Sequence, residues 1–203
     1  MFILIQRAVG FGVAAGSTPG PLLTYIINET LLHGWRHSVF IIFTPLLTDA
    51  PIILLSVLVL DQFPDGVLTA ISIVGGLFVL WMAYGSWKRS NQAVVINTDA
   101  VKLRRYSIAR GMMVNLLSPA PYIFWGTVTG PLLVEALDES LWWGLAFLAA
   151  FYGPFMATMA LIALVFNRMR HLNERIVRGL LRFAALLLMF FGLSLIASGL
   201  GIA

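Results

Sequence analysis

The sequence Thr18-Pro19-Gly20-Pro21 interrupts an apolar segment that runs from about residue 2 to residue 32. Proline lacks a backbone N–H and disfavours helical geometry in the residue before it, so two prolines around a glycine predict a break in the helix. The flanking residues are nevertheless apolar enough for the core of a membrane. Because lipid cannot hydrogen-bond the freed carbonyl groups, such a break is tolerated only inside protein or against a water-filled cavity.

The composition is that of a membrane protein. Of the 203 residues, 60% are hydrophobic and 11% are charged, whereas about a quarter of the residues are charged in a soluble domain. The mean hydropathy is +0.92. We therefore expect an all-α membrane protein in the cytoplasmic (inner) membrane, with the lipid bilayer as a partner. No signal peptide is visible, so we expect the first apolar segment to be retained.

Six apolar segments are long enough to be transmembrane helices. A second proline motif, Ser118-Pro119-Ala120-Pro121, lies one hundred positions after the first, in the fourth segment. Both motifs fall near the middle of their segments, so both helix breaks are expected near the bilayer midplane. A further interruption is expected at Gly153-Pro154 in the fifth segment. The six segments span approximately residues 2–32, 38–60, 67–87, 106–134, 141–166 and 179–200.

The six segments divide the charged residues between the two sides of the membrane. Twelve of the 13 Lys and Arg residues, Arg110 among them, lie in or next to the loops after the first, third and fifth segments. The loops after the second and fourth segments contain acidic residues and no Lys or Arg. The positive-inside rule then places the basic loops in the cytoplasm and both termini outside. This distribution explains the net charge of +4 without a nucleic-acid partner.

The two proline motifs indicate an internal repeat of three segments. We expect one transmembrane domain that consists of repeat 1 (residues 1–87), a cytoplasmic loop (88–105) and repeat 2 (106–203). Because three spans reverse the direction of the chain, the two repeats must have opposite orientations. Asp49-Ala50-Pro51 and Tyr152-Gly153-Pro154 fall at similar positions in the second segment of each repeat. Two inverted three-helix repeats, with helices 1 and 4 broken, are typical of secondary transporters.

Two acidic residues lie inside the apolar segments. Asp49 precedes Asp61 of an acidic loop by twelve residues, or ~18 Å of helix, which places it near the midplane. A carboxylate there costs ~2.5 kcal/mol or more on an isolated helix and should face a cavity or a partner. We predict that Asp49 and Glu29 bind a cationic group or a coupling ion, and a proton is one candidate. The alternatives are a protonated Asp49 bonded to a carbonyl freed by a proline, and a Glu29 that is only an interfacial charge.

Several kinds of chemistry are excluded by the residues that are missing. The chain has no cysteine, so disulfides and thiolate metal ligands are excluded. Its three histidines, His33, His37 and His171, lie in or beside polar loops. The i,i+4 spacing of His33 and His37 is one at which a metal can bind, but we expect solvated side chains. With no phosphate-binding glycine loop and no catalytic constellation at depth, we expect no enzyme activity, no cofactor and no metal.

Several stretches from both halves of the chain form a pattern together: Gly16, Thr18-Pro19-Gly20-Pro21, Gly34, Arg36, residues 76–85 and residues 110–119. These stretches resemble the LysE/RhtB family of amino-acid exporters, and the resemblance covers most of the chain. It implies a membrane protein that moves amino acids or related metabolites outward, usually driven by an ion gradient. The second motif departs from the family pattern, with Ser118 where Asn is usual and Ala120 where Lys is usual.

These observations predict a secondary transporter that exports a small solute, an amino acid or a related metabolite, by alternating access. At the two breaks, half-helix N-termini favour a carboxylate and C-terminal carbonyls favour an ammonium group. Thr48 is a further hydrogen-bonding residue near Asp49. The predicted substrate-binding residues are Thr18, Pro19, Gly20, Pro21, Asn115, Ser118, Pro119 and Pro121.

The sequence leaves two other functions and a homodimer as alternatives. The first alternative is a cation- or proton-coupled exporter, or a metal-ion exporter, on the same scaffold. The second is a non-transporting membrane subunit or a lipid-modifying enzyme. A homodimer is open through the third and sixth segments, which are apolar and contain glycine.

Overall fold

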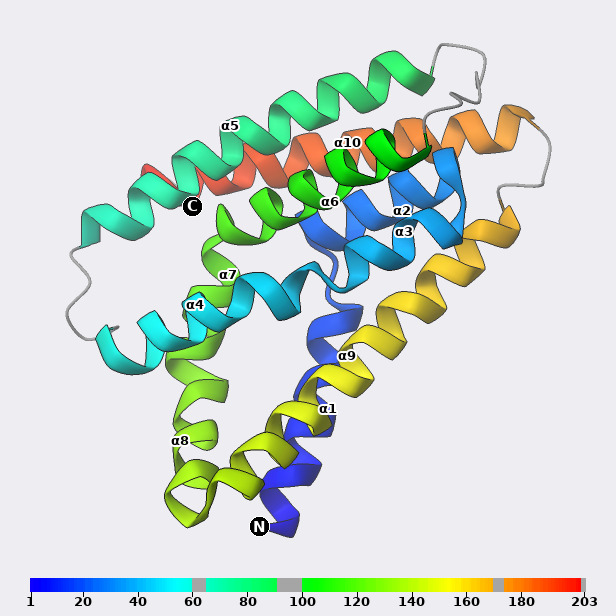
Figure 1. The fold of residues 1–203 in the computed structure, drawn as a ribbon. Coiled ribbons are helices and arrows are strands. Elements are labelled where there is room, and N and C mark those ends of the chain that lie inside the picture. Colours follow the sequence, from blue (N-terminus) through cyan, green and yellow to red (C-terminus); the bar gives the residue numbers. More distant parts are fainter. Residues whose placement is uncertain (60–64, 91–99, 170–173, 202–203) are drawn as a thin grey trace.

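The computed structural model describes residues 1–59, 65–90, 100–169 and 174–201, and these residues form helices and no strands. Figure 1 shows the order and arrangement of the helices. The first half contains α1 (Phe2–Ser17), α2 (Pro21–His33), α3 (Trp35–Ile42), α4 (Thr44–Val59) and α5 (Asp65–Ser90). The second half contains α6 (Ala100–Leu116), α7 (Pro119–Phe124), the π-helix η2 (Trp125–Thr129), α8 (Gly130–Glu139), α9 (Leu141–Met169) and α10 (Glu174–Gly199).

The first proline motif breaks the helix, as predicted. After the end of α1, Thr18 has an extended backbone with φ −66° and ψ 121°. Gly20 is also extended, and α2 then begins at Pro21. Proline suits the start of a helix because the N–H groups of the first turn have no partner within the helix.

The second motif also breaks the helix, over fewer residues. Ser118 is extended, with φ −99° and ψ 129°, and α7 begins immediately afterwards at Pro119. The hydroxyl of Tyr122 donates a hydrogen bond of 3.0 Å to the carbonyl of Leu116, the last residue of α6. A carbonyl freed by the break is therefore satisfied by protein, as the membrane setting requires.

Three local features differ from the sequence-based prediction. The expected interruption at Gly153-Pro154 is wrong, because α9 is continuous with Pro154 inside it. Local adjustments of the backbone allow proline inside membrane helices. The π-helix over Trp125–Thr129 was not predicted. Helices α5 and α6 also extend into the predicted loop 88–105, as far as Ser90 and from Ala100.

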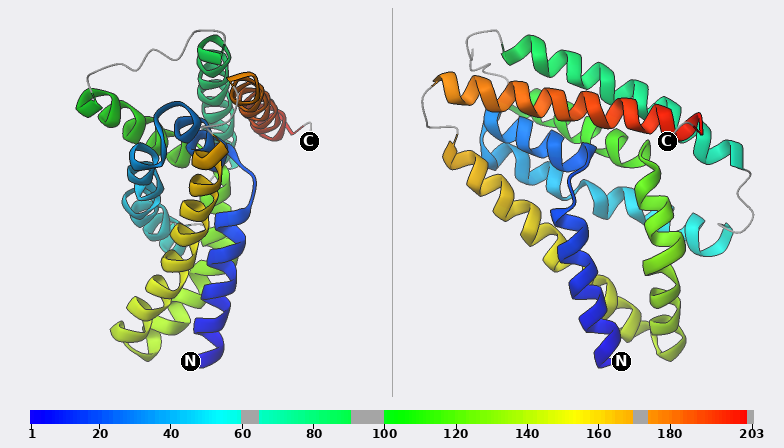
Figure 2. Two further views of the ribbon diagram at one scale, coloured as in Figure 1. Left: turned by 90° about the vertical axis from the view of Figure 1, so that its right-hand side faces the viewer. Right: turned by 180° about the vertical axis from the view of Figure 1, so that it is seen from behind.

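Helices α5 and α10 lie side by side over much of their length (Figures 1 and 2). Their backbones approach closely at two glycines. A Cβ atom added to Gly76 would lie 2.7 Å from the carbonyl oxygen of Gly192, and one added to Gly192 would lie 3.0 Å from that of Gly76. Close contact through small residues is a common way for helices to associate in membranes.

Two further helix pairs each join the two halves of the chain. Helix α1 packs along α9, and α4 packs against α6. Figure 2 shows α1 beside α9 in both of its views. These three pairs all join elements of different halves, so the two halves pack closely against each other.

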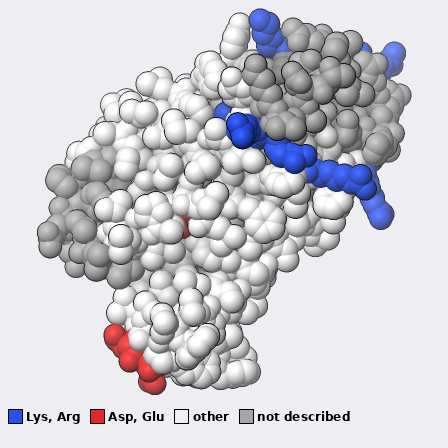
Figure 3. Space-filling view, viewed as in Figure 1, with Lys and Arg blue, Asp and Glu red and all other residues white. Residues whose placement is uncertain are grey.

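Four stretches of the described chain are long and apolar enough to cross a membrane, and α1 is a shorter apolar helix. The breaks divide the first and fourth predicted segments into shorter helices, so the count of six spans stays a prediction. Lys and Arg side chains gather at one end of the molecule and acidic side chains at the opposite end, where α8 lies (Figures 1 and 3). The four long stretches are Trp35–Leu55, Thr69–Lys88, Leu141–Met169 and Arg175–Gly199.

Candidate functional site

The carboxylate of Asp49 lies at the centre of a buried hydrogen-bond network. Asp49 belongs to α4 and is 5% exposed. The amide of Asn115, on α6, donates a hydrogen bond of 2.6 Å to its Oδ1 atom. The hydroxyl of Tyr152, on α9, donates one of 2.9 Å to its Oδ2 atom. The network therefore joins one helix of the first half to two helices of the second half.

The same network extends to Thr48 and to the aromatic side chain of Trp125. The Asn115 amide also donates a hydrogen bond of 2.7 Å to Thr48 Oγ1. Trp125, in the π-helix, is buried next to Tyr152, with 6.1 Å between their ring centroids, and is a further polar neighbour of Asp49. Hydrogen bonds are stronger in such a low-dielectric setting, and unpaired polar groups cost more there. Both carboxylate oxygens of Asp49 are met by side-chain donors.

The first proline motif contributes less to this network than the sequence led us to expect. Thr18 and Pro19 are exposed. The Thr18 hydroxyl donates a hydrogen bond of 2.7 Å to the carbonyl of Ala14 in its own helix. Of the predicted residues in the second motif, Ser118 is buried three residues after Asn115. The half-buried residues of the two motifs are Gly20, Pro21, Pro119 and Pro121.

A second polar cluster surrounds Glu29, which is 1% exposed. The hydroxyl of Ser107, on α6, donates a hydrogen bond of 2.7 Å to Glu29 Oε2. His33 Nδ1 lies 3.2 Å and His37 Nε2 lies 3.4 Å from the same oxygen. His37 Nε2 also contacts the Ser107 hydroxyl at 2.9 Å. The interpretation of Glu29 as only an interfacial charge is therefore wrong.

The prediction that His33 and His37 are solvated is also wrong. His37 is 9% exposed, and His33 is half-buried. The physical reason is Gly34, whose φ of 86° turns the chain between α2 and α3. The two histidines therefore lie on different helices, and His37 folds back toward Glu29. The sequence spacing alone suggested one continuous helix face.

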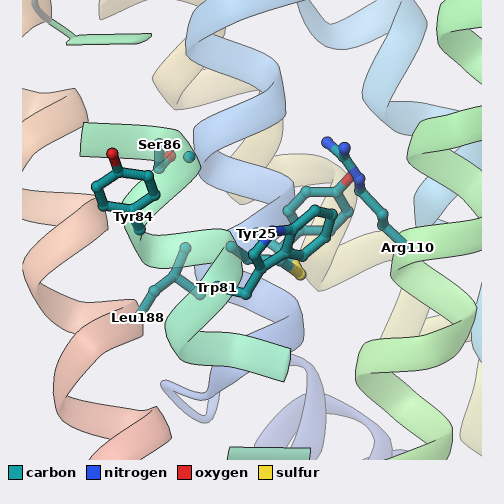
Figure 4. A pocket seen from close by; sticks show the side chains of 8 residues that line it. Tyr25, Trp81, Tyr84, Ser86, Arg110 and Leu188 are labelled. Carbon is teal, nitrogen blue, oxygen red and sulfur yellow. The ribbon is translucent and has the colours of Figure 1, made fainter. Parts of the chain in front are cut away.

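A cavity of about 300 Å³ lies between α2, α5, α6 and α10. The guanidinium of Arg110 lies over the ring of Trp81, 5.1 Å from its centroid. Figure 4 shows Tyr25 and Arg110 close to Trp81, with Ser86 and Leu188 further along the cavity wall. The cavity combines a cation, aromatic faces and a hydroxyl, and its volume is at the lower end of the range for ligand pockets. In the sequence, Arg110 indicated only the topology.

Helix α6 contributes one residue to each of these three features. Ser107 belongs to the Glu29 cluster, Arg110 lines the cavity, and Asn115 binds Asp49. Ser107 and Asn115 are separated by eight positions, or ~12 Å along the helix. Tyr25 connects the cavity to the Glu29 cluster, because its hydroxyl donates a hydrogen bond of 3.2 Å to the Ser107 carbonyl. Movement of α6 would therefore affect all three.

Apolar helices with polar groups buried among them define the class of polytopic helical membrane proteins. Within that class, the chain belongs to the LysE type translocator family, whose model matches residues 13–199. The resemblance to the LysE/RhtB family found in the sequence is therefore confirmed. The family is one of translocators, not of enzymes.

Two relatives are similar to part of the chain. The threonine efflux protein of Escherichia coli (strain K12) is 28% identical over 138 residues. The threonine efflux protein of Salmonella typhimurium (strain LT2) is 25% identical over 134 residues. Each alignment covers 64% of this chain and 65% of the relative, slightly less than two-thirds of the relative's length. The comparison with solved structures gave no significant match.

Proposed function

We propose that the chain is a secondary transporter that exports an amino acid or a related small solute across the cytoplasmic membrane by alternating access. The observation that carries the proposal is the network of Asp49, Asn115 and Tyr152, which holds a carboxylate between helices of both halves. A carboxylate buried among membrane helices is costly, and such residues mark ion and substrate pathways. Membership of the LysE type translocator family supports the same function.

Threonine is the first substrate to test, because the two relatives are named threonine efflux proteins. An amino acid carries a carboxylate and an ammonium group. In the cavity, Arg110 is suited to the carboxylate, since a guanidinium can hold both of its oxygens. The aromatic rings of Trp81 and Tyr25 offer faces for an ammonium group or an apolar side chain. The cavity therefore serves as the proposed substrate site, with the helix breaks along the route out of it.

Asp49 is the proposed carrier of a coupling proton. In the charged state it accepts hydrogen bonds from Asn115 and Tyr152. A proton on Oδ2 would turn that oxygen into a donor, and the Tyr152 hydroxyl would then have to accept instead. The amide nitrogen of Asn115 can only donate, so Asn115 could accept a hydrogen bond only if its side chain rotated to present the amide oxygen. Protonation therefore alters the bond between α4 and α9, which is a way to connect an ion gradient to helix movement.

Two inverted repeats would explain how the helices pair. In such a repeat, α1 corresponds to α6, α4 to α9 and α5 to α10. The contact of α1 with α9 then corresponds to the contact of α6 with α4, and the contact of α5 with α10 corresponds to itself. Asp49 and Tyr152, at similar positions in the two halves, are in contact. We place the basic end of the molecule (Figure 3) in the cytoplasm and both termini outside, following the positive-inside rule.

The proposal is tested with the purified protein in liposomes. Uptake of labelled threonine, driven by an imposed pH gradient, should be saturable and should need the protein. The variant Asp49→Asn should lose the dependence on the gradient, whereas Asp138→Asn, an exposed acidic residue at the end of α8, should keep it. A correctly inserted protein that moves no amino acid under any gradient would remove the proposed function.

A further inference from the structure

We propose that Glu29, His33 and His37 form a binding site for a divalent transition-metal ion such as Zn²⁺. The site lies where α2 turns into α3, away from the Asp49 network. Its three donor atoms lie within 4.8 Å of one another. The proposal does not depend on which solute the protein exports.

The distances from the Glu29 oxygen to the two histidine nitrogens match those around a four-coordinate metal. The oxygen and nitrogen ligands of Zn²⁺ lie about 2.0–2.2 Å from the metal, so two ligands of a tetrahedral site are about 3.3–3.5 Å apart. Glu29 Oε2 lies 3.2 Å from His33 Nδ1 and 3.4 Å from His37 Nε2. The two histidine nitrogens lie within 4.8 Å of each other, so a metal could bind between the three donor atoms once these nitrogens take up the tetrahedral spacing.

His33 Nδ1 is the least well satisfied of the three donor atoms. This atom is buried, and among the described residues no group makes a hydrogen bond with it. It is in ion-pair contact with the Glu29 carboxylate oxygen at 3.2 Å, but without the alignment of a hydrogen bond. A buried polar nitrogen without a hydrogen bond is costly, and a metal between it and the carboxylate would remove that cost.

Ser107 positions the other two ligands from the opposite half of the chain. Its hydroxyl donates to Glu29 Oε2 at 2.7 Å and contacts His37 Nε2 at 2.9 Å. Outer contacts of this kind orient metal ligands in known sites. When a metal binds, His37 Nε2 must give up any proton that it carries, while the bond from Ser107 to Glu29 can stay.

The donor set selects the kind of metal. Two imidazoles and one carboxylate suit Zn²⁺, Ni²⁺, Co²⁺ or Cu²⁺, whereas Mg²⁺ and Ca²⁺ prefer oxygen ligands alone. Three protein ligands leave one position for water. A bound ion would fix α2 to α3 directly and to α6 through Ser107. We therefore expect the metal to hold the two halves together at this end and to inhibit movement between them.

Zinc titration of the full-length protein tests the proposal. The protein is purified in detergent with a tag that contains no histidine, and Zn²⁺ binding is followed by calorimetry. The background is low, because the chain has no cysteine and only three histidines. We expect one ion per chain, and affinity at least about tenfold weaker in His33→Ala and in His37→Ala. The control His171→Ala, outside the described residues, should bind as the unchanged protein does.

Thermal unfolding separates loss of the site from loss of the fold. Zn²⁺ should raise the unfolding temperature of the unchanged protein and of His171→Ala, because an ion that binds only the folded state stabilises it. It should not raise that of His33→Ala or of Glu29→Gln, which keeps the size of the side chain. The proposal is overturned if the unchanged protein shows no saturable binding of one ion. Undiminished binding in the double variant H33A/H37A would overturn it equally.

Discussion

The hydroxyl of Tyr152 donates a hydrogen bond of 2.9 Å to Oδ2 of Asp49, although 103 positions separate the two residues in the sequence. Both lie two residues before a proline in the second long segment of their half. In the inverted repeat proposed above, residues at equivalent positions would meet where they lie close to the repeat axis. We therefore expect this contact to transmit a change in the protonation of Asp49 to both halves of the chain.

Removing the Tyr152 hydroxyl tests this coupling. In Tyr152→Phe, Asp49 loses the donor to its Oδ2 atom, and a hydrogen bond to a charged group contributes about 1.5–3 kcal/mol. We expect a lower unfolding temperature and at least about tenfold slower threonine transport. Tyr106→Phe is the control, because Tyr106 is exposed on α6 and does not line the cavity.

A double-mutant cycle shows whether the two residues act together. If they do, adding Tyr152→Phe to Asp49→Asn should cost less than the sum of the two single changes, measured as free energies of unfolding. Strict additivity, within about 0.5 kcal/mol, would show that the contact does not couple the two residues.

The side chain of Arg110 should decide how well the substrate binds. In Arg110→Gln the proposed partner of the substrate carboxylate is lost, at a cost of about 1.5–3 kcal/mol, which corresponds to about a 10- to 150-fold rise in KM for threonine. The maximal rate should change much less. Arg105→Gln, an exposed residue on the same helix, should leave both values unchanged. An unaltered KM in Arg110→Gln would mean that the substrate binds elsewhere.

Gly75 should be essential for packing at the second helix break. A Cβ atom there would lie 1.7 Å from the carbonyl oxygen of Leu117, so α5 and the break would have to separate. We expect Gly75→Ala to lower the free energy of unfolding by about 1–3 kcal/mol or more. In the control Gly85→Ala the added atom meets no described residue within 4 Å, and alanine should stabilise the helix slightly. Equal unfolding temperatures for the two variants would contradict this account.

The helix breaks could be predicted because their cause is local. Proline and glycine restrict the backbone wherever they occur, and a lone carboxylate such as Asp49 is recognisable in an apolar segment. The partners could not be predicted in this way. Ser107 binds a residue 78 positions away, and a serine in an apolar helix gives no local signal that it has such a partner. The similar placement of Tyr152 and Asp49 in the two halves was visible in the sequence, but it did not by itself predict their contact.

Pro154 and Trp125 are positions at which rules based on the local sequence fail. Proline predicted an interruption of α9, yet the helix continues through Pro154 because packing and small backbone adjustments override the local preference. The π-helix at Trp125–Thr129 contains no residue that would mark it in the sequence. Both depend on contacts with other helices, which a single sequence does not display.

Gly34 should be required for the cluster of Glu29, His33 and His37. Its φ of 86° lies in the left-handed region, where a residue with a Cβ atom costs about 1–3 kcal/mol. In Gly34→Ala the turn between α2 and α3 should relax, and His37 should move away from Glu29. We expect a lower unfolding temperature together with Zn²⁺ affinity at least about tenfold weaker. Gly153→Ala is the control, because Gly153 lies inside α9 and an added Cβ would meet no described residue within 4 Å. If Gly34→Ala lowered stability but kept full zinc affinity, the turn would not be what brings His37 to the site.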